Sequence, residues 1–168
     1  DLPDQTGRTI VVTGSTSGIG RHAALELARS GARVVIAARN ELKIAETVKA
    51  IEAAVPGAQL ERLVIDVSDL DSVRRAAGVA TAFGPIDVLI NNAGIMGVPF
   101  ATTRDGLESQ LATNHFGPFL LTGMLLPQLV ESGAGRVVTV ASGAHRSARE
   151  APLGDPRDHS APYKRWAV

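Results

Sequence analysis

The sequence contains no cysteine, and its 168 residues include only one tyrosine and one tryptophan. Without cysteine the chain can form no disulfide and offers no thiolate to a substrate or a metal, which fits a reducing cytosol. It also lacks an apolar run near the roughly 20 residues that a membrane-spanning helix needs, and its start shows no basic-then-apolar signal pattern. We therefore expect a cytoplasmic protein with no membrane partner.

Neither sign of charge is in excess, because 17 lysine and arginine residues balance 17 aspartate and glutamate residues. A net charge near zero gives no reason to expect nucleic acid as a partner. The four histidines are scattered, at positions 22, 115, 145 and 159, and none has a companion ligand at a suitable spacing. The sequence therefore predicts no metal site.

Five short apolar runs recur along the chain, and each predicts a buried strand. Most are continuous rather than alternating, as expected for parallel strands that are covered on both faces. Helical patterns lie between them, so strand and helix alternate and predict an α/β fold with a doubly wound parallel sheet of strand order 3-2-1-4-5. The predicted strands cover residues 9–12, 33–38, 60–65, 88–90 and 136–141.

A glycine-rich turn follows the first predicted strand, with the sequence Thr13-Gly14-Ser15-Thr16-Ser17-Gly18-Ile19-Gly20. It leads into a helix over residues 19–30 that would bury Ile19, Ala23 and Leu27 on one face. Glycine lets the backbone approach a ligand where a Cβ would clash, and the unpaired N–H groups of a helix start suit a pyrophosphate. No lysine lies in the turn, which disfavours a triphosphate-binding loop. A turn that serves packing alone is the alternative.

The spacing T-G-x-x-x-G-I-G resembles that of the short-chain dehydrogenase/reductase family letter for letter. The resemblance implies a Rossmann-type fold and a single dinucleotide-binding domain over residues 1–168. An epimerase of the extended family is disfavoured, because such proteins usually carry G-x-x-G-x-x-G. The resemblance assigns cofactor contacts to Gly14, Ser15, Thr16, Ser17, Gly18, Ile19 and Gly20.

Arg39 follows the second predicted strand, at the place that meets the adenosine ribose in a dinucleotide site. An arginine there would pair with a 2′-phosphate, whereas a carboxylate would repel it. Ala38 occupies the position where NAD-preferring members of the family tend to carry aspartate. We therefore favour NADP(H) as the cofactor, with NAD(H) as the alternative and Arg21 as an added positive charge. A solvated Arg39 that only leads into the next helix remains the other interpretation.

Asp66 and Val67 end the third predicted strand and resemble the Asp-Val/Leu pair of the family. The resemblance implies that this pair holds the edge of the adenine ring. The alternative role for Asp66 is to cap the helix that follows. Ser68 is the better candidate for that N-cap, because Asp71 lies three residues on, as in a capping box.

The fourth predicted strand ends in Asn91-Asn92-Ala93-Gly94, which matches the N-N-A-G motif of the family. Paired side-chain amides can tie neighbouring strands together, while Ala93 and Gly94 leave room for a ribose. By resemblance Asn92, Ala93 and Gly94 belong to the cofactor site. A structural role for the motif is equally open.

A long apolar helix is predicted over residues 107–130, and it contains Asn114 and Pro118. Proline removes the N–H that would bond the carbonyl four residues earlier, which here belongs to Asn114. The resemblance places the catalytic asparagine of the family at Asn114, where its backbone carbonyl holds a water in a proton relay. A plain kink is the alternative.

Ser142 closes the fifth predicted strand. The resemblance implies that its hydroxyl hydrogen-bonds the substrate carbonyl and steadies the developing oxyanion. A serine hydrolase is excluded, because no G-x-S-x-G elbow surrounds Ser142. The stretch Ser142-Gly143-Ala144-His145-Arg146 resembles the branch that contains retinol dehydrogenases and WW-domain oxidoreductases. The resemblance further implies a small carbonyl or alcohol substrate and a homodimer or homotetramer.

The resemblance stops at the catalytic Y-x-x-x-K motif. The only tyrosine is Tyr163, and Ala167 stands where the lysine would be. In this branch a segment like residues 163–167 typically lies just upstream of the catalytic tyrosine, and the sequence stops at Val168. We favour an oxidoreductase domain that lacks its C-terminal helix and last strands, because the fifth strand would otherwise be an uncovered edge. The alternative is a nucleotide-binding or regulatory module without turnover.

Overall fold

The structure, a computed structural model, describes residues 2–143, 146, 154–160 and 162–163. Five parallel strands form one sheet in the order β3-β2-β1-β4-β5, so the predicted strand order is confirmed. Every predicted strand is present, and its ends agree with the prediction to within two residues. The strands are β1 (Thr9–Thr13), β2 (Arg33–Ala38), β3 (Leu60–Val64), β4 (Val88–Asn91) and β5 (Arg136–Thr139).

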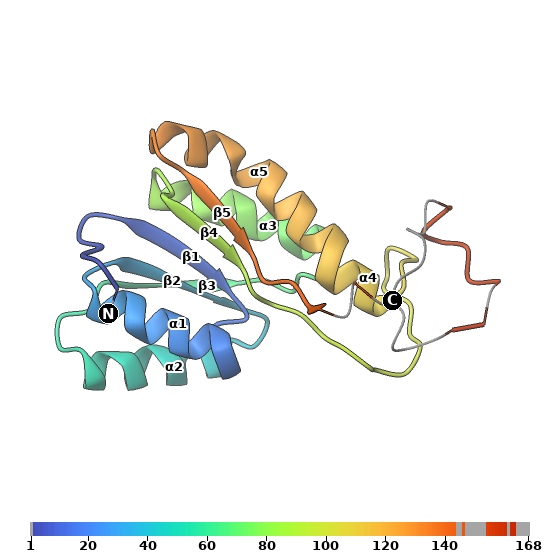
Figure 1. The fold of residues 1–168 in the computed structure, drawn as a ribbon, viewed down its shortest axis with the longest axis horizontal. Helices are drawn as coiled ribbons and strands as arrows, with labels where there is room; N and C mark the ends of the chain where they lie inside the picture. Colours follow the sequence, from blue (N-terminus) through green and yellow to red (C-terminus); the bar gives the residue numbers. More distant parts are fainter. Residues whose placement is uncertain (1, 144–145, 147–153, 161, 164–168) are drawn as a thin grey trace.

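Helices lie on both faces of the sheet (Figure 1). Successive strand residues point to opposite faces, so Ile10 and Val12 pack with α1 and α2 while Val11 packs with α3 and α5. Within the part of the chain that the structure describes, no helix is long and apolar enough to cross a membrane. The helices are α1 (Gly18–Arg29), α2 (Glu41–Ala54), α3 (Leu70–Ala80), the 3-10 turn η1 (Thr81–Phe83), α4 (Ser109–Leu111), the π turn η2 (Ala112–Phe116) and α5 (Gly117–Glu131).

The first helix buries a different face from the predicted one. Gly20, Ala24 and Ala28 are buried against the sheet, whereas Ile19 is 73% exposed. Only small residues fit this contact, because a Cβ on Gly20 would meet the carbonyl of Gly14. Ile19 lies one residue away from this line, which is about 100° around a helix, and it therefore points outward.

The third helix is capped by Asp69, so the prediction of Ser68 as the N-cap is wrong. Asp69 Oδ1 accepts hydrogen bonds from the N–H groups of Asp71 at 2.9 Å and Ser72 at 3.1 Å. The Ser68 hydroxyl instead donates to Asp66 Oδ1 at 2.6 Å. Ser68 is therefore part of the turn before the helix, which the capping-box spacing alone cannot reveal.

Residues 107–130 are predicted as one helix, but the structure starts it later and inserts a π turn. In η2 the N–H of Gly117 bonds the carbonyl of Ala112, five residues back. Pro118 then lies in the first turn of α5, where a missing N–H is tolerated. Gly117 lies so close to Val67 that a Cβ would overlap the carbonyl oxygen of that residue. The π turn thus ends where α5 meets the segment that follows β3.

Gly117→Ala is expected to lower the free energy of unfolding by about 1–3 kcal/mol, because the added methyl would overlap the Val67 carbonyl and force α5 away. Urea unfolding measures this change. Gly123→Ala in the same helix is the matched control, since its added Cβ meets nothing within 4 Å. That control should stabilise the protein by about 0.5–1 kcal/mol. Equal effects of the two substitutions would contradict the close approach of α5 to Val67.

Candidate functional site

The carboxyl ends of β1, β2 and β4 meet at one edge of the sheet, because the strands are parallel. Thr13 of β1 is in register with Ala37 of β2, and Val12 is in register with Ile90 of β4. The glycine turn leaves β1 at this edge and leads into α1. Ligands of doubly wound sheets bind at such an edge, next to the strand where the order reverses.

The glycine turn adopts a backbone that favours glycine. Gly14 has a φ of 66° and Gly18 a φ of 51°, both in the left-handed region. A Cβ on Gly14 would lie 2.9 Å from the Cα of Ala93, and one on Gly20 would meet the side-chain amide of Asn92. Nothing lies within 4 Å of a Cβ placed on Gly18, so the turn is open on that side.

Ser15 fixes the glycine turn to β2. Its side chain is fully buried, and Ser15 Oγ accepts a hydrogen bond from the N–H of Ala37 at 2.9 Å. The N–H of Gly14 donates to the carbonyl of the same residue at 2.8 Å. The Ser15 hydroxyl is therefore used inside the protein, where it holds the shape of the turn.

The first helix starts without a side-chain cap. Ser17 is the N-cap residue, but its side chain makes no capping hydrogen bond, and the first turn of α1 contains no acidic residue. The next two long helices differ, because Asn40 caps α2 and Asp69 caps α3. The start of α1 therefore combines N–H groups that no side chain caps with the positive end of the helix dipole, a combination that attracts anions.

Thr13 locks the segment after β4 onto β1. Its Oγ1 accepts hydrogen bonds from the N–H groups of Asn92 and Ala93, both at 3.0 Å. In return Asn92 Nδ2 donates to the Thr13 carbonyl at 2.8 Å. The amide of Asn92 therefore ties the two strands together, and Ala93 and Gly94 follow directly along the same edge.

A cavity of about 240 Å³ lies beside the glycine turn and carries two positive side chains. Arg39 is exposed just past the end of β2. None of the ion pairs found among the described residues involves Arg21, Arg39 or Lys43. Lys43 is not among the residues predicted from the sequence, although its place four residues after Arg39 is a signal for a second basic residue near the same site. The cavity is lined by Thr16, Arg21, Lys43, Glu46 and Thr47.

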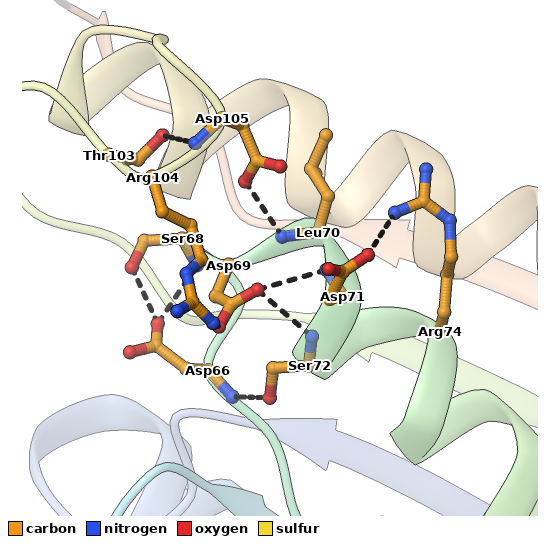
Figure 2. Close-up of polar contacts among 10 residues, drawn as sticks. All are labelled: Asp66, Ser68, Asp69, Leu70, Asp71, Ser72, Arg74, Thr103, Arg104 and Asp105. Atoms are coloured by element: carbon orange, nitrogen blue, oxygen red, sulfur yellow. Dashed lines mark hydrogen bonds and ion pairs between the residues drawn. The ribbon is translucent and has the colours of Figure 1, made fainter.

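Asp66 shapes the turn between β3 and α3 (Figure 2). Its Oδ1 accepts hydrogen bonds from the N–H of Ser68 at 2.9 Å and from the hydroxyl of the same residue at 2.6 Å. Its N–H donates to Ser72 Oγ at 2.9 Å. Val67 follows as a buried residue, with 6% of its surface exposed.

Asp69 holds the start of α3 as an ionised carboxylate. A hydrogen bond from the N–H of Ser72 keeps the pKa of Asp69 below its ordinary value, against the raising effect of desolvation. The N–H of Asp71 and the positive charges of Arg104 and Arg75 lower the pKa further. Among the described residues, this segment included, no three histidine or acidic side chains gather as metal ligands would.

The side chain of Asn114 holds the loop that follows β4. Asn114 Oδ1 accepts a hydrogen bond from the N–H of Ile95 at 2.9 Å, and Nδ2 donates to the Ile95 carbonyl at 2.8 Å. Gly94 passes close by, since a Cβ there would lie 3.2 Å from Asn114 Oδ1. The side chain is thereby occupied, and Pro118 has no N–H to offer the Asn114 carbonyl.

Asn91 lies beside the same edge with half of its amide unpaired. Asn91 Nδ2 donates to Thr122 Oγ1 at 3.0 Å, whereas the buried Oδ1 has no partner among the described residues. The Asn91 carbonyl accepts a hydrogen bond from the N–H of Val140 at 2.9 Å, and Ser142 lies exposed two residues further on.

A second cavity, of about 380 Å³, lies at this end of the sheet. It is lined by Asn91, Asn114, His115, Pro118, Phe119, Thr122, Gly123, Val137 and Thr139.

Tyr163 is taken up by contacts inside the protein. Its hydroxyl accepts a hydrogen bond from Gln110 Nε2 at 2.6 Å and lies 3.1 Å from the Val98 carbonyl, to which it can donate. Its ring makes an edge contact with Phe100, with centroids 5.2 Å apart. These contacts fasten Tyr163 to the loop before α4 and agree with its failure to match the Y-x-x-x-K motif.

The chain belongs to the short-chain dehydrogenase family, whose model matches residues 8–151. Within the family it is similar to the retinol dehydrogenase branch. It is 45% identical to retinol dehydrogenase 12 of Bos taurus over 83% of this chain and 44% of that protein. It is 46% identical to polyprenol dehydrogenase of Mus musculus over 86% of this chain and 44% of that protein. The chain thus spans less than half the length of these two curated relatives.

Solved structures show the same fold. A Mycobacterium paratuberculosis protein, described as uncharacterized, superimposes with a TM-score of 0.81 at 45% identity, covering 99% of this chain and 57% of that one. A metagenomic short-chain oxidoreductase solved in complex with NADP gives a TM-score of 0.69 at 33% identity, covering 82% of this chain and 63% of that one. The match to both confirms the Rossmann-type sheet.

Thr13→Val is expected to destabilise the protein by about 2 kcal/mol, because it removes the acceptor of two backbone N–H groups without changing the side-chain shape. Urea unfolding measures the loss. The control is Thr81→Val, which removes an exposed hydroxyl that bonds only the Gly78 carbonyl. The control should change stability by less than about 0.5 kcal/mol. A Thr13→Val variant as stable as the control would show that the lock between β1 and β4 contributes little.

Proposed function

We propose that the protein is an oxidoreductase that transfers hydride between NADP(H) and a carbonyl or alcohol substrate. The observation that carries this proposal is the glycine turn, which is fixed to β2 by Ser15 and to β4 by Thr13 and which opens onto the start of α1. A rigid, positively polarised turn without a side-chain cap suits a pyrophosphate, and Gly14 and Gly20 leave no room for Cβ atoms.

The residues along this edge fit the remaining parts of the dinucleotide. Arg39 would pair with a 2′-phosphate, and Arg21 and Lys43, which line the cavity beside the glycine turn, would add positive charge. Asp66 and Val67 would hold the adenine, and Asn92, Ala93 and Gly94 would line the site of the second ribose. The pyrophosphate would lie on the turn formed by Gly14, Ser15, Thr16, Ser17, Gly18, Ile19 and Gly20. When bound, the nicotinamide supplies or accepts the hydride.

For the reacting carbonyl we assign two residues. The Ser142 hydroxyl would donate a hydrogen bond to the substrate oxygen and stabilise negative charge as it develops there. Asn114 would hold a water through its backbone carbonyl, since its side chain is committed to Ile95. The Y-x-x-x-K motif of the family does not occur in the 168 residues, so we assign proton transfer to none of them.

The relatives support dehydrogenase activity, but they do not single out one substrate, because they include both a retinol dehydrogenase and a polyprenol dehydrogenase. A homodimer or homotetramer through α5 is part of the proposal. It is supported by exposed apolar side chains on that helix, among them Phe119 and Val130, which are 72% and 70% exposed. A cytoplasmic location stays a prediction, and some relatives are chloroplastic proteins.

Arg39→Asp is expected to weaken NADPH binding by about 10- to 100-fold, because a charge-assisted contact to the 2′-phosphate is lost and a repulsive one appears. NADH binding should be unchanged or stronger. Nicotinamide fluorescence titration of both cofactors measures the ratio. An equal fall in affinity for NADPH and NADH would contradict the role of Arg39.

Lys43→Ala is expected to weaken NADPH binding by about tenfold and to leave NADH binding unchanged, because Lys43 lines the cavity in which the 2′-phosphate would lie. The matched control is Lys49→Ala, which removes the same charge from an exposed position of α2 that does not line the cavity. A similar loss in both variants would indicate a general charge effect rather than a contact.

Turnover needs its own test. When the chain is joined to a segment that supplies the Y-x-x-x-K motif, it should catalyse the oxidation of NADPH by suitable ketones or aldehydes. The absorbance of the reduced nicotinamide measures this reaction. Ser142→Ala should then lower kcat by about 100-fold with little change in NADPH affinity. Tight NADPH binding without turnover on a broad carbonyl panel would favour a regulatory nucleotide-binding module instead.

A further inference from the structure

The start of α3 is capped by carboxylates from two distant segments (Figure 2). Asp69 caps the N–H groups of Asp71 and Ser72 from within the same turn. The remaining N–H, that of Leu70, donates at 3.1 Å to Oδ2 of Asp105, which lies 35 residues further along the chain. Both carboxylates lie at the positive end of the helix dipole, where negative charge is favoured.

Asp105 is held in place by its own loop, which joins β4 to α4. The Asp105 N–H lies 3.3 Å from Thr103 Oγ1 and points toward it. The backbone around it is closed by hydrogen bonds from the Thr103 N–H to the Leu107 carbonyl at 2.8 Å and from the Gly106 N–H to the Thr103 carbonyl at 3.0 Å. Beside it, Arg104 pairs with Asp69 Oδ2 at 3.5 Å. The loop therefore presents Asp105 to α3 in a defined geometry.

The first turn of α3 in turn fixes the segment that follows β3. Ser72 Oγ accepts the N–H of Asp66 at 2.9 Å, and the Asp66 carboxylate closes the turn onto Ser68. On its other side Val67 contacts the backbone of Gly117 at the start of α5. A change at the start of α3 would therefore displace Asp66 and Val67, which are attached to it directly, more than it would displace the strands of the sheet.

We propose that Asp105 is a positioning residue of the cofactor site: by capping the Leu70 N–H it holds Asp66 and Val67 where the adenine ring packs. The inference rests on the proposed function, since it requires an adenine-containing cofactor at this end of β3. Among the described residues no hydrogen bond joins Asp105 to Asp66, so Asp105 would act through Leu70 and the first turn of α3. The loop that runs from the Asn92 segment toward Asn114 thereby also sets the adenine end of the site.

A purely structural cap would predict a different outcome from a positioning residue. Loss of a cap lowers global stability and reduces binding of every ligand alike, through the folded fraction. Loss of positioning weakens ligands that carry adenosine and spares those that do not. Two fragments separate these outcomes: adenosine 2′,5′-bisphosphate carries the adenosine half of NADPH, and reduced nicotinamide mononucleotide carries the other half.

The experiment measures the affinity of both fragments and of NADPH by calorimetry, well below the midpoint of thermal unfolding of each variant. Asp105→Ala should weaken adenosine 2′,5′-bisphosphate and NADPH by about five- to tenfold and leave reduced nicotinamide mononucleotide within about twofold, because one charge-assisted hydrogen bond is lost. Asp105→Asn keeps an acceptor for the Leu70 N–H and should restore most of the affinity.

The matched control is Asp71→Ala, which removes a carboxylate from the same helix turn. Asp71 pairs with Arg74 at 2.9 Å on an exposed surface, and no hydrogen bond or ion pair found among the described residues joins its side chain to the 103–105 loop. Equal affinities in Asp105→Ala and Asp71→Ala, or an Asp105→Asn variant as weak as Asp105→Ala, would overturn the inference. If the unsubstituted chain binds neither NADPH nor adenosine 2′,5′-bisphosphate, the proposed function fails instead, and the inference falls with it.

Discussion

The exchange of hydrogen bonds between Thr13 and Asn92 is the interaction on which the candidate site depends. It joins β1, the strand at the centre of the sheet, to the segment that leaves β4, and Ser15 adds a second attachment to β2. Parallel strands bring their ends to one edge, but they do not by themselves fix the loops that follow. These side-chain bonds hold the loops after β1 and β4 at the close backbone distances that Gly14 and Gly20 require.

Much of the architecture could be predicted from the sequence because its cause is local. Continuous apolar runs that alternate with helical patterns determine a parallel sheet, and a glycine turn after the first strand locates its ligand edge. The strand order followed from these two facts and a general rule of handedness. Arg39, Asp66 and Asn92 could be found in the same way, because strand ends can be read from where the apolar runs stop.

The features that the sequence did not predict correctly, or did not predict at all, depend on contacts between distant segments rather than on local patterns. The helical spacing predicts Ile19 as a core residue, but α1 packs through Gly20 against Gly14 and leaves Ile19 exposed. Ser68 had the spacing of a cap, but its hydroxyl is bound by Asp66. Asp105 carries no motif at all, and its contact with Leu70 spans 35 residues. The residue pattern of one helix does not predict which carboxylate of a distant loop will cap that helix.

The π turn η2 makes the length of one stretch matter more than its residue types. Because the Gly117 N–H bonds Ala112 rather than the residue after it, the helix holds one more residue here than an α-helix of the same rise. Deleting one residue between Ala112 and Phe116 would leave an α-helix of the same rise, so the two flanking halves would keep their relation while the residues left inside the turn would shift around the helix. Asn114 lies inside this turn, so its pairing with Ile95 depends on the length of the turn. Substitutions in this segment can be accommodated one side chain at a time, whereas a change in its length cannot.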